Sequence, residues 1–107
     1  LRGVGQGCGH DLSVGMLNDL AGDDRYRGSF LCQGAGNANG IGILEDFKGN
    51  DEYFSEQDDC RGFGNPFRDY GSIGLFLDRN GTDRYSGRGG NGRLWTGGRY
   101  GAGTDLP

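Results

Sequence analysis

The chain has 107 residues, of which 25 are glycine and only 2 are proline, and its formal net charge is −4. The acidic side chains (12 Asp, 3 Glu) and the basic ones (10 Arg, 1 Lys) leave no basic patch, and no run of about 18 apolar residues occurs, so we expect neither a nucleic-acid partner nor a membrane span. Glycine at more than three times its ordinary share of about 7% makes one large hydrophobic core hard to build, and the absence of a Gly-x-y period excludes collagen.

One pattern occurs three times along the chain, at residues 15–26, 42–53 and 74–85. It reads Gly-(apolar)2-x-Asp-x-x-Gly-x-Asp-x-Tyr without a gap, and its copies start 27 and 32 residues apart. A low apolar content would permit disorder, but a disordered chain needs no such regular placement of apolar residues, Asp and Tyr. The pattern therefore indicates a folded repeat protein.

A shorter Gly-x-Gly pattern alternates with the long one and begins at Gly7, Gly34, Gly62 and Gly101. The extra residues of the longer units lie in bends such as 65–70, where insertions are tolerated. Several glycines per unit exclude helical repeats, and the units are too short for four-stranded propeller blades. We predict an all-β fold, a parallel β-solenoid of about three to four rungs with a period of about 27–32 residues, in a single domain over residues 1–107. Because Leu1 and Pro107 both fall inside repeats, we expect the chain to be a piece of, or a building block for, a longer array.

Stacking the repeats turns equivalent residues into columns about 4.8 Å apart. The predicted columns are Tyr26, Tyr53 and Tyr85; Leu17, Leu44 and Phe76; Val14, Ile41 and Ile73; and Arg25, Glu52 and Arg84. The last column alternates in charge, which favours neighbouring strands. Met16, Ile43 and Leu75 alternate in phase with the Val14 column, so both faces of this strand are apolar. Either a bulge intervenes, or another sheet, domain or copy covers the outer face.

Two columns carry charges of one sign, Asp19, Asp46 and Asp78 in one and Asp24, Asp51 and Asp83 in the other. Like charges stacked at rung spacing repel one another, so water, an arginine or a cation must offset them. Calcium takes six to eight oxygen ligands from carboxylates and backbone carbonyls, which glycine-rich turns expose. These six aspartates are therefore the candidate metal ligands.

Residues 22–26, 49–53 and 81–85 read Gly-Asp-Asp-Arg-Tyr, Gly-Asn-Asp-Glu-Tyr and Gly-Thr-Asp-Arg-Tyr. They resemble the second half of the Gly-Gly-x-Gly-x-Asp-x-(apolar)-x repeat of the calcium-binding repeats-in-toxin (RTX) β-rolls. The resemblance implies that Asp24, Asp51 and Asp83 bind Ca²⁺ between turns and that the three tyrosines point inward. The first two glycines of that repeat have no counterpart here.

Two other interpretations of the aspartates remain open. They can accept hydrogen bonds from turn amides or pair with Arg25, Arg27, Arg79 and Arg84, as Asp in turns commonly does. Residues 78–83 also look like an EF-hand loop, but the glutamate expected at its twelfth position is absent.

Cys32 and Cys60 occupy the same position in successive repeats. Stacked neighbours lie within the Cα separation of a disulfide, so we predict a Cys32–Cys60 bond and an oxidising compartment. The alternative is a pair of reduced cysteines in one inward column. Cys8 is left over, either free or bridged to another part of the protein.

Three further features have simpler explanations than a site. His10 lies in a bend and is expected to be solvated. Asn80-Gly81-Thr82 is a glycosylation sequon, but it lies within the turn expected to hold the metal. Trp95 with Arg93 and Tyr100 would suit a sugar-stacking surface, although packing over an open end of the solenoid fits better.

Two classes of function fit these observations. The first is an extracellular structural or assembly protein that binds calcium and pairs edge to edge with further copies or a longer chain, because an uncapped solenoid exposes strand edges at both ends. The second is a carbohydrate-binding or polysaccharide-active β-helix, with a glycan as partner. We predict no catalytic residue, since the acidic groups are repeated and catalytic groups normally are not. A toxin role would rest on the RTX analogy alone.

Overall fold

The computed structural model describes residues 6–66 and 71–106 as a chain of short strands. The strands are β1 (Gly9–His10), β2 (Val14–Asp19), β3 (Arg25–Gly28), β4 (Gly36–Asn37), β5 (Ile41–Asp46), β6 (Glu52–Ser55), β7 (Ile73–Arg79), β8 (Arg84–Tyr85), β9 (Leu94–Thr96) and β10 (Tyr100–Leu106). The described residues include no helix long and apolar enough to cross a membrane.

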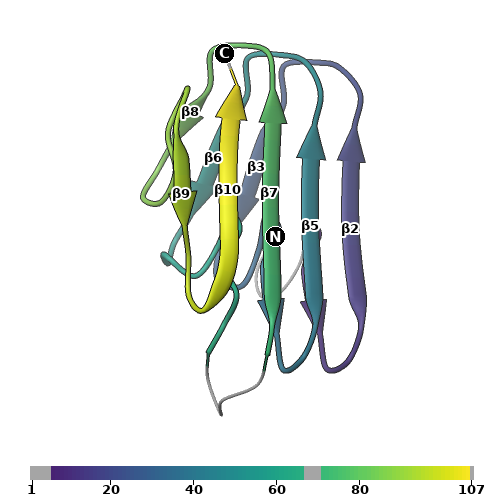
Figure 1. The fold of residues 1–107 in the computed structure, drawn as a ribbon. Helices are drawn as coiled ribbons and strands as arrows, with labels where there is room; N and C mark the ends of the chain where they lie inside the picture. Colours follow the sequence, from purple (N-terminus) through teal and green to yellow (C-terminus); the bar gives the residue numbers. More distant parts are fainter. Residues whose placement is uncertain (1–5, 67–70, 107) are drawn as a thin grey trace.

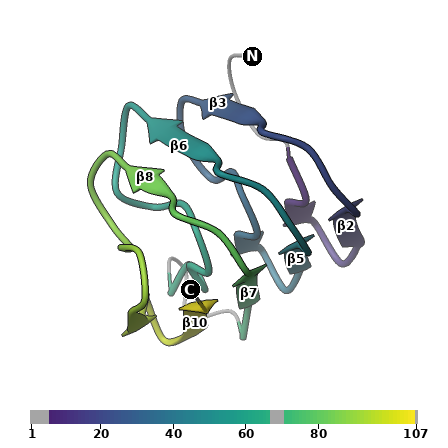
Figure 2. The same ribbon diagram turned by 90° about the horizontal axis from the view of Figure 1, so that it is seen from above.

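Three sheets run along the molecule, with strand orders β1-β4, β2-β5-β7-β10-β9 and β3-β6-β8. Figure 1 shows β2, β5, β7 and β10 side by side as arrows that point the same way, and Figure 2 shows β3, β6 and β8 facing them across the interior. Each turn of the chain, here called a rung, adds one strand to each of the two larger sheets, while the two-stranded sheet is continued by isolated bridges at Gly64 and Gly98. The prediction of an all-β parallel β-solenoid is therefore confirmed, with about three rungs.

The register between rungs is the one that the gapless repeat predicts. Gly15 lies opposite Gly42 and Gly42 opposite Gly74, so the three copies stack residue on residue. Added to Gly42, a Cβ atom would lie 1.9 Å from the Ala35 carbonyl oxygen. The first glycine of the pattern is thus required where this strand passes the chain of the β1-β4 sheet.

The second glycine of the pattern is required for a different reason. Gly22, Gly49 and Gly81 have φ values of 126°, 134° and 131°, which L side chains rarely adopt. At Gly49 a Cβ atom would also approach the Gly22 carbonyl oxygen to 1.7 Å. This glycine lets the turn between the two large sheets stack closely on the turn before it.

The C-terminal end differs from the prediction. Gly98, not Gly101, continues the Gly-x-Gly column by pairing with Gly64, whereas Gly101 lies opposite Gly74. The assignment of Gly101 to the Gly-x-Gly pattern was wrong, because β10 is instead a truncated copy of the long pattern. β9 then pairs antiparallel with β10, so this end of the five-stranded sheet is not an open parallel edge.

The interior between the two large sheets is filled by the predicted apolar and aromatic columns. Leu44, Phe76, Tyr26 and Tyr53 form the buried cluster. Ring centroids of Tyr26 and Tyr53 lie 4.9 Å apart, as do those of Tyr53 and Tyr85, and both pairs are stacked. The aromatic ladder is therefore confirmed, and burial of these rings contributes apolar stabilisation to the fold.

The fully buried Arg61 ends a polar column that lies beside the aromatic one. Its Nη1 donates to Gln33 Oε1 at 2.9 Å, and Gln33 Nε2 donates to Gln6 Oε1 at 3.1 Å. Burial lowers the pKa of Arg61 to about 10. In the same region Cys32 and Cys60 form the predicted disulfide, with a Cα–Cα distance of 4.8 Å, while Cys8 is free and half-buried.

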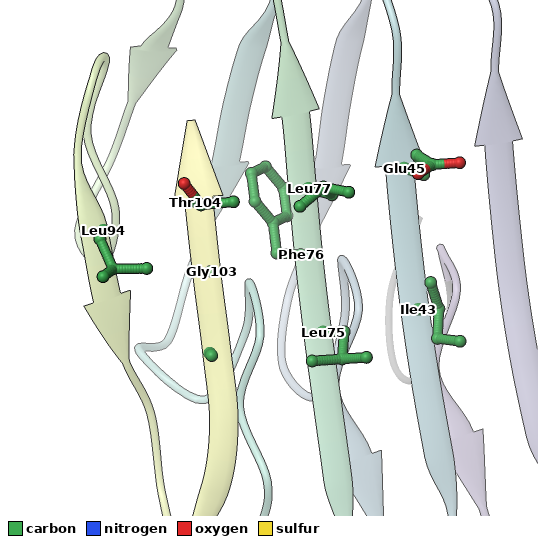
Figure 3. A pocket seen from close by; sticks show the side chains of 9 residues that line it. Ile43, Glu45, Leu75, Phe76, Leu77, Leu94, Gly103 and Thr104 are labelled. Atoms are coloured by element: carbon green, nitrogen blue, oxygen red, sulfur yellow. The ribbon is translucent and has the colours of Figure 1, made fainter. Parts of the chain in front are cut away.

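The outer face of the five-stranded sheet is apolar and uncovered in the described part of the chain. Val14, Met16 and Leu75 are 67%, 58% and 43% exposed, and β2, β5 and β7 pair in one continuous register. A bulge thus does not explain the two apolar faces. Figure 3 shows an open groove on this face, where the small residues of β10 lie between Leu75 and Leu77 on one side and Leu94 on the other.

Candidate metal centre

The six predicted aspartates lie together along one corner of the solenoid, where the chain passes from the five-stranded to the three-stranded sheet. Asp19 and Asp46 end β2 and β5, while Asp78 lies near the end of β7, and the three lie opposite one another in register. Asp24, Asp51 and Asp83 directly precede β3, β6 and β8, the three strands of the opposite sheet. The two columns therefore face each other across one turn.

The carboxylates form three groups of three, in each of which one oxygen per residue lies within 4.8 Å of the others. The groups are Asp19, Asp24 and Asp46; Asp46, Asp51 and Asp78; and Asp78, Asp83 and Asp105. Asp46 and Asp78 each belong to two groups. The groups therefore form one row along the solenoid axis, and each could hold a metal ion.

One oxygen of most of these carboxylates is held by a donor on the preceding rung. Tyr26 donates its hydroxyl to Asp46 Oδ2 at 2.6 Å, and Tyr53 donates to Asp78 Oδ2. The backbone N–H of Asp24 donates to Asp51 Oδ1 at 2.8 Å, and that of Asp51 donates to Asp83 Oδ1 at 2.7 Å. These donors fix the orientation of each carboxylate, so its second oxygen points in a defined direction.

The second oxygens lack such donors. Among the described residues, five buried carboxylate oxygens have no hydrogen-bond partner: Asp24 Oδ2, Asp46 Oδ1, Asp51 Oδ2, Asp78 Oδ1 and Asp83 Oδ2. Asp46 and Asp78 are 0% exposed and Asp51 is 1% exposed. A buried, unpaired carboxylate oxygen is costly, and a cation held among oxygen ligands removes that cost. The donor set, which is all oxygen, suits calcium better than a thiolate-seeking metal.

Burial and mutual repulsion make these groups reluctant to ionise together. The pKa of Asp78 is raised from 3.8 to about 8, first by burial and then by the charges of Asp83 and Asp105. The pKa of Asp51 is raised to about 7 by burial, and that of Asp83 to about 6. The pKa of each of the three tyrosines is also raised, by burial and by its aspartate. A bound cation would lower the pKa values of these aspartates, because its positive charge stabilises the ionised carboxylates.

Three of the four arginines that could neutralise the row contact other groups. Arg25 pairs with Glu52 at 3.4 Å and Arg79 with Glu45 at 3.3 Å, so both contact glutamates of the outer surface. Arg27 lies over the Phe54 ring, 5.9 Å from its centroid. The alternative in which the aspartates accept hydrogen bonds from turn amides is correct in part, because such amides donate to one oxygen of Asp51 and of Asp83.

Asp105 was missing from the predicted ligands. It lies in β10 opposite Asp78, is 2% exposed and completes the third group. The signal was present in the sequence, since residues 101–105 repeat the Gly-x-x-x-Asp start of the long pattern and begin 27 residues after Gly74. The second half of the pattern does not follow, and this concealed the match.

Two single residues considered in the sequence analysis lie outside the row. Trp95 packs against Phe76 and Tyr85 with centroid distances of 5.4 and 5.7 Å, which confirms that it packs over the end of the solenoid. His10 is exposed and contacts Asn37 and Asp11. Neither residue joins the aspartate groups.

Comparison with known proteins adds no assignment: no family model, no curated protein and no solved structure matches the chain.

Proposed function

We propose that the chain is an extracellular structural β-solenoid that binds calcium along its aspartate row and associates with further copies or with a longer chain. The observation that carries the calcium proposal is the set of five buried carboxylate oxygens without a partner among the described residues, all of which belong to aspartates of the three groups. The RTX resemblance of residues 22–26, 49–53 and 81–85 supports the same ion. The Cys32–Cys60 disulfide supports an oxidising, extracellular location.

The association proposal rests on the outer face and on the strand edges. Val14, Met16 and Leu75 leave an apolar surface on the five-stranded sheet, and such surfaces mark sites of interaction. β2 and β3 are the first strands of their sheets, and neither has a second neighbour among the described residues. A free parallel edge favours pairing with another strand.

Calcium titration of the EDTA-treated chain tests the proposal. Calcium in about 100-fold excess over its dissociation constant should add about 2.7 kcal/mol per site to the free energy of unfolding, measured by thermal or denaturant unfolding. Asp46→Asn should lose most of this gain because Asp46 belongs to two groups. Asp11→Asn, an exposed aspartate outside the row, is the matched control and should respond like the parent chain.

The same samples, analysed by sedimentation, test the association. Species larger than a monomer are expected with calcium. A chain that binds no calcium, as judged by calorimetry, would contradict the calcium proposal. A chain that binds calcium but stays monomeric at high concentration would contradict the association.

A further inference from the structure

Asp105 joins the aspartate row to the last part of the chain. It lies in β10 and accepts a hydrogen bond from the Tyr85 hydroxyl at 2.6 Å and one from the Gly92 N–H at 3.0 Å. Its own N–H donates to the Arg93 carbonyl at 2.9 Å. The Asp105 carboxylate thus contacts β8 and the turn before β9, and its backbone N–H contacts the same turn.

The turn before β9 also contacts the row directly. Asn91 Oδ1 accepts the backbone N–H of Asp83 at 2.8 Å, in the place where a further aspartate of that column would accept it. A neutral amide therefore ends this column. Residues 91–106, here called the cap, close the row at the C-terminal end of the solenoid.

The third group differs from the other two in the parts of the chain that it joins. Asp78 and Asp83 belong to the third rung, whereas Asp105 belongs to the cap. All three are buried, and Asp78 and Asp83 each have one oxygen without a partner. One oxygen of each carboxylate lies within 4.8 Å of the others, so a single cation in contact with all three would join the cap to the third rung.

We infer that a calcium ion bound by Asp78, Asp83 and Asp105 fixes the cap to the third rung, so that calcium controls whether the cap is docked. This inference rests on the proposed calcium binding. It adds Asp105 as a ligand from outside the three complete repeats. The first and second groups contain no cap residue, so their ions stabilise the rungs without holding the cap.

Trp95 provides a direct readout of the cap. It is the single tryptophan of the chain, it lies in β9, and its Nε1 donates to the Arg61 carbonyl at 2.8 Å. Its contacts with Phe76 and Tyr85 exist only when the cap is docked. Tryptophan fluorescence therefore reports docking, separately from the total number of ions bound.

The experiment compares Asp105→Asn with Asp19→Asn at the other end of the row. Each EDTA-treated variant is titrated with calcium while bound ions are counted by calorimetry and Trp95 fluorescence is recorded. The unchanged chain should bind three ions, one per group, with a blue shift of the Trp95 emission. Asp105→Asn should bind one ion fewer and lose the shift, whereas Asp19→Asn should also bind one ion fewer but keep it.

The possible results distinguish a failure of the cap inference from a failure of the calcium-binding proposal. An unchanged chain that binds no calcium overturns both. Calcium binding with an Asp105→Asn variant that keeps the ion count and the Trp95 shift overturns the cap inference alone. Should Asp105→Asn fail to fold, hydrogen exchange on the unchanged chain decides: calcium must slow exchange in residues 94–106 more than in residues 14–19, and equal slowing overturns the inference.

Discussion

The two ends of this solenoid are built differently. At the N-terminal end, β2 and β3 begin their sheets, and the first aspartate group contains the half-buried Asp19 and Asp24. At the C-terminal end, β9 folds back antiparallel, and Asp105 is 2% exposed. The N-terminal end has the features of an ordinary rung, whereas the C-terminal end has residues that no other rung contains.

The contrast shows how a repeat is terminated. Gly103 lies opposite Phe76, and a Cβ atom at Gly103 would meet the Trp95 ring at 2.2 Å. The indole from β9 therefore occupies the space that a fourth member of the apolar column would fill. Arg61 reinforces this end by donating to the carbonyls of Ser86 and Arg88 in the chain between β8 and β9. Terminal units with altered residues are expected where a solenoid ends.

Removal of the Trp95 ring should have the largest effect. Trp95→Ala should lower the free energy of unfolding by about 3 kcal/mol, because it empties the space over Gly103 and removes contacts with Phe76 and Tyr85. Chemical denaturation in the presence of calcium measures it. Leu94→Ala, in the same strand but 78% exposed, is the control and should change stability by less than about 0.5 kcal/mol. Equal effects of the two substitutions would show that the cap contributes little.

The pH dependence without metal should be the next largest effect. The folded-state pKa of Asp78 is about 8 and that of Asp51 about 7, both raised from 3.8, so the folded chain binds more protons than the unfolded chain between these values. Stability in EDTA should therefore fall as pH rises from about 4 to about 8. We expect the unfolding temperature to drop by on the order of 10 °C between pH 5 and pH 9.

Variants at the two ends sharpen this test. Asp78→Asn should remove much of the pH dependence, because an amide does not ionise in the most buried part of the row. Asp19→Asn, at the half-exposed N-terminal end, should leave most of it. Excess calcium should reverse the trend, since the ion binds the ionised carboxylates. A metal-free chain that is as stable at pH 9 as at pH 5 would contradict the raised pKa values.

Much of this organisation is predictable from the sequence because the repeat has no gap. A pattern of fixed length fixes the register, and the register then places Tyr53 under Tyr26, Asp51 beside Asp46, and Cys32 beside Cys60. The residue columns could be predicted without knowing the conformation of the bends that join the strands. The candidate metal site was therefore predictable up to the point where the repeat stops.

The rest was not predictable because the C-terminal end departs from the repeat. Asp105 follows a truncated copy of the pattern, and Trp95 reaches its position through an antiparallel turn that has no counterpart in the other rungs. Sequence periodicity carries no information about a segment that occurs once. The apolar outer face is the opposite case: its residues were predicted, and the described chain supplies nothing that covers them.

The smallest effect should come from the exposed ion pairs. Arg25 at the N-terminal end pairs with Glu52, and its side chain is 72% exposed, so Arg25→Ala should lower the free energy of unfolding by less than about 0.5 kcal/mol. Arg79 pairs with the less exposed Glu45 and also lies over the Phe47 ring, 5.1 Å from its centroid. Arg79→Ala should therefore cost about 1 kcal/mol.

Urea unfolding at low and high salt distinguishes the two contributions. The Arg25→Ala effect should vanish in about 1 M NaCl, where exposed charges are screened within about 3 Å. Part of the Arg79→Ala effect should persist, because the contact with Phe47 also buries the apolar part of the arginine side chain. Equal losses in both variants, both removed by salt, would mean that the contact of Arg79 with the Phe47 ring contributes nothing to stability.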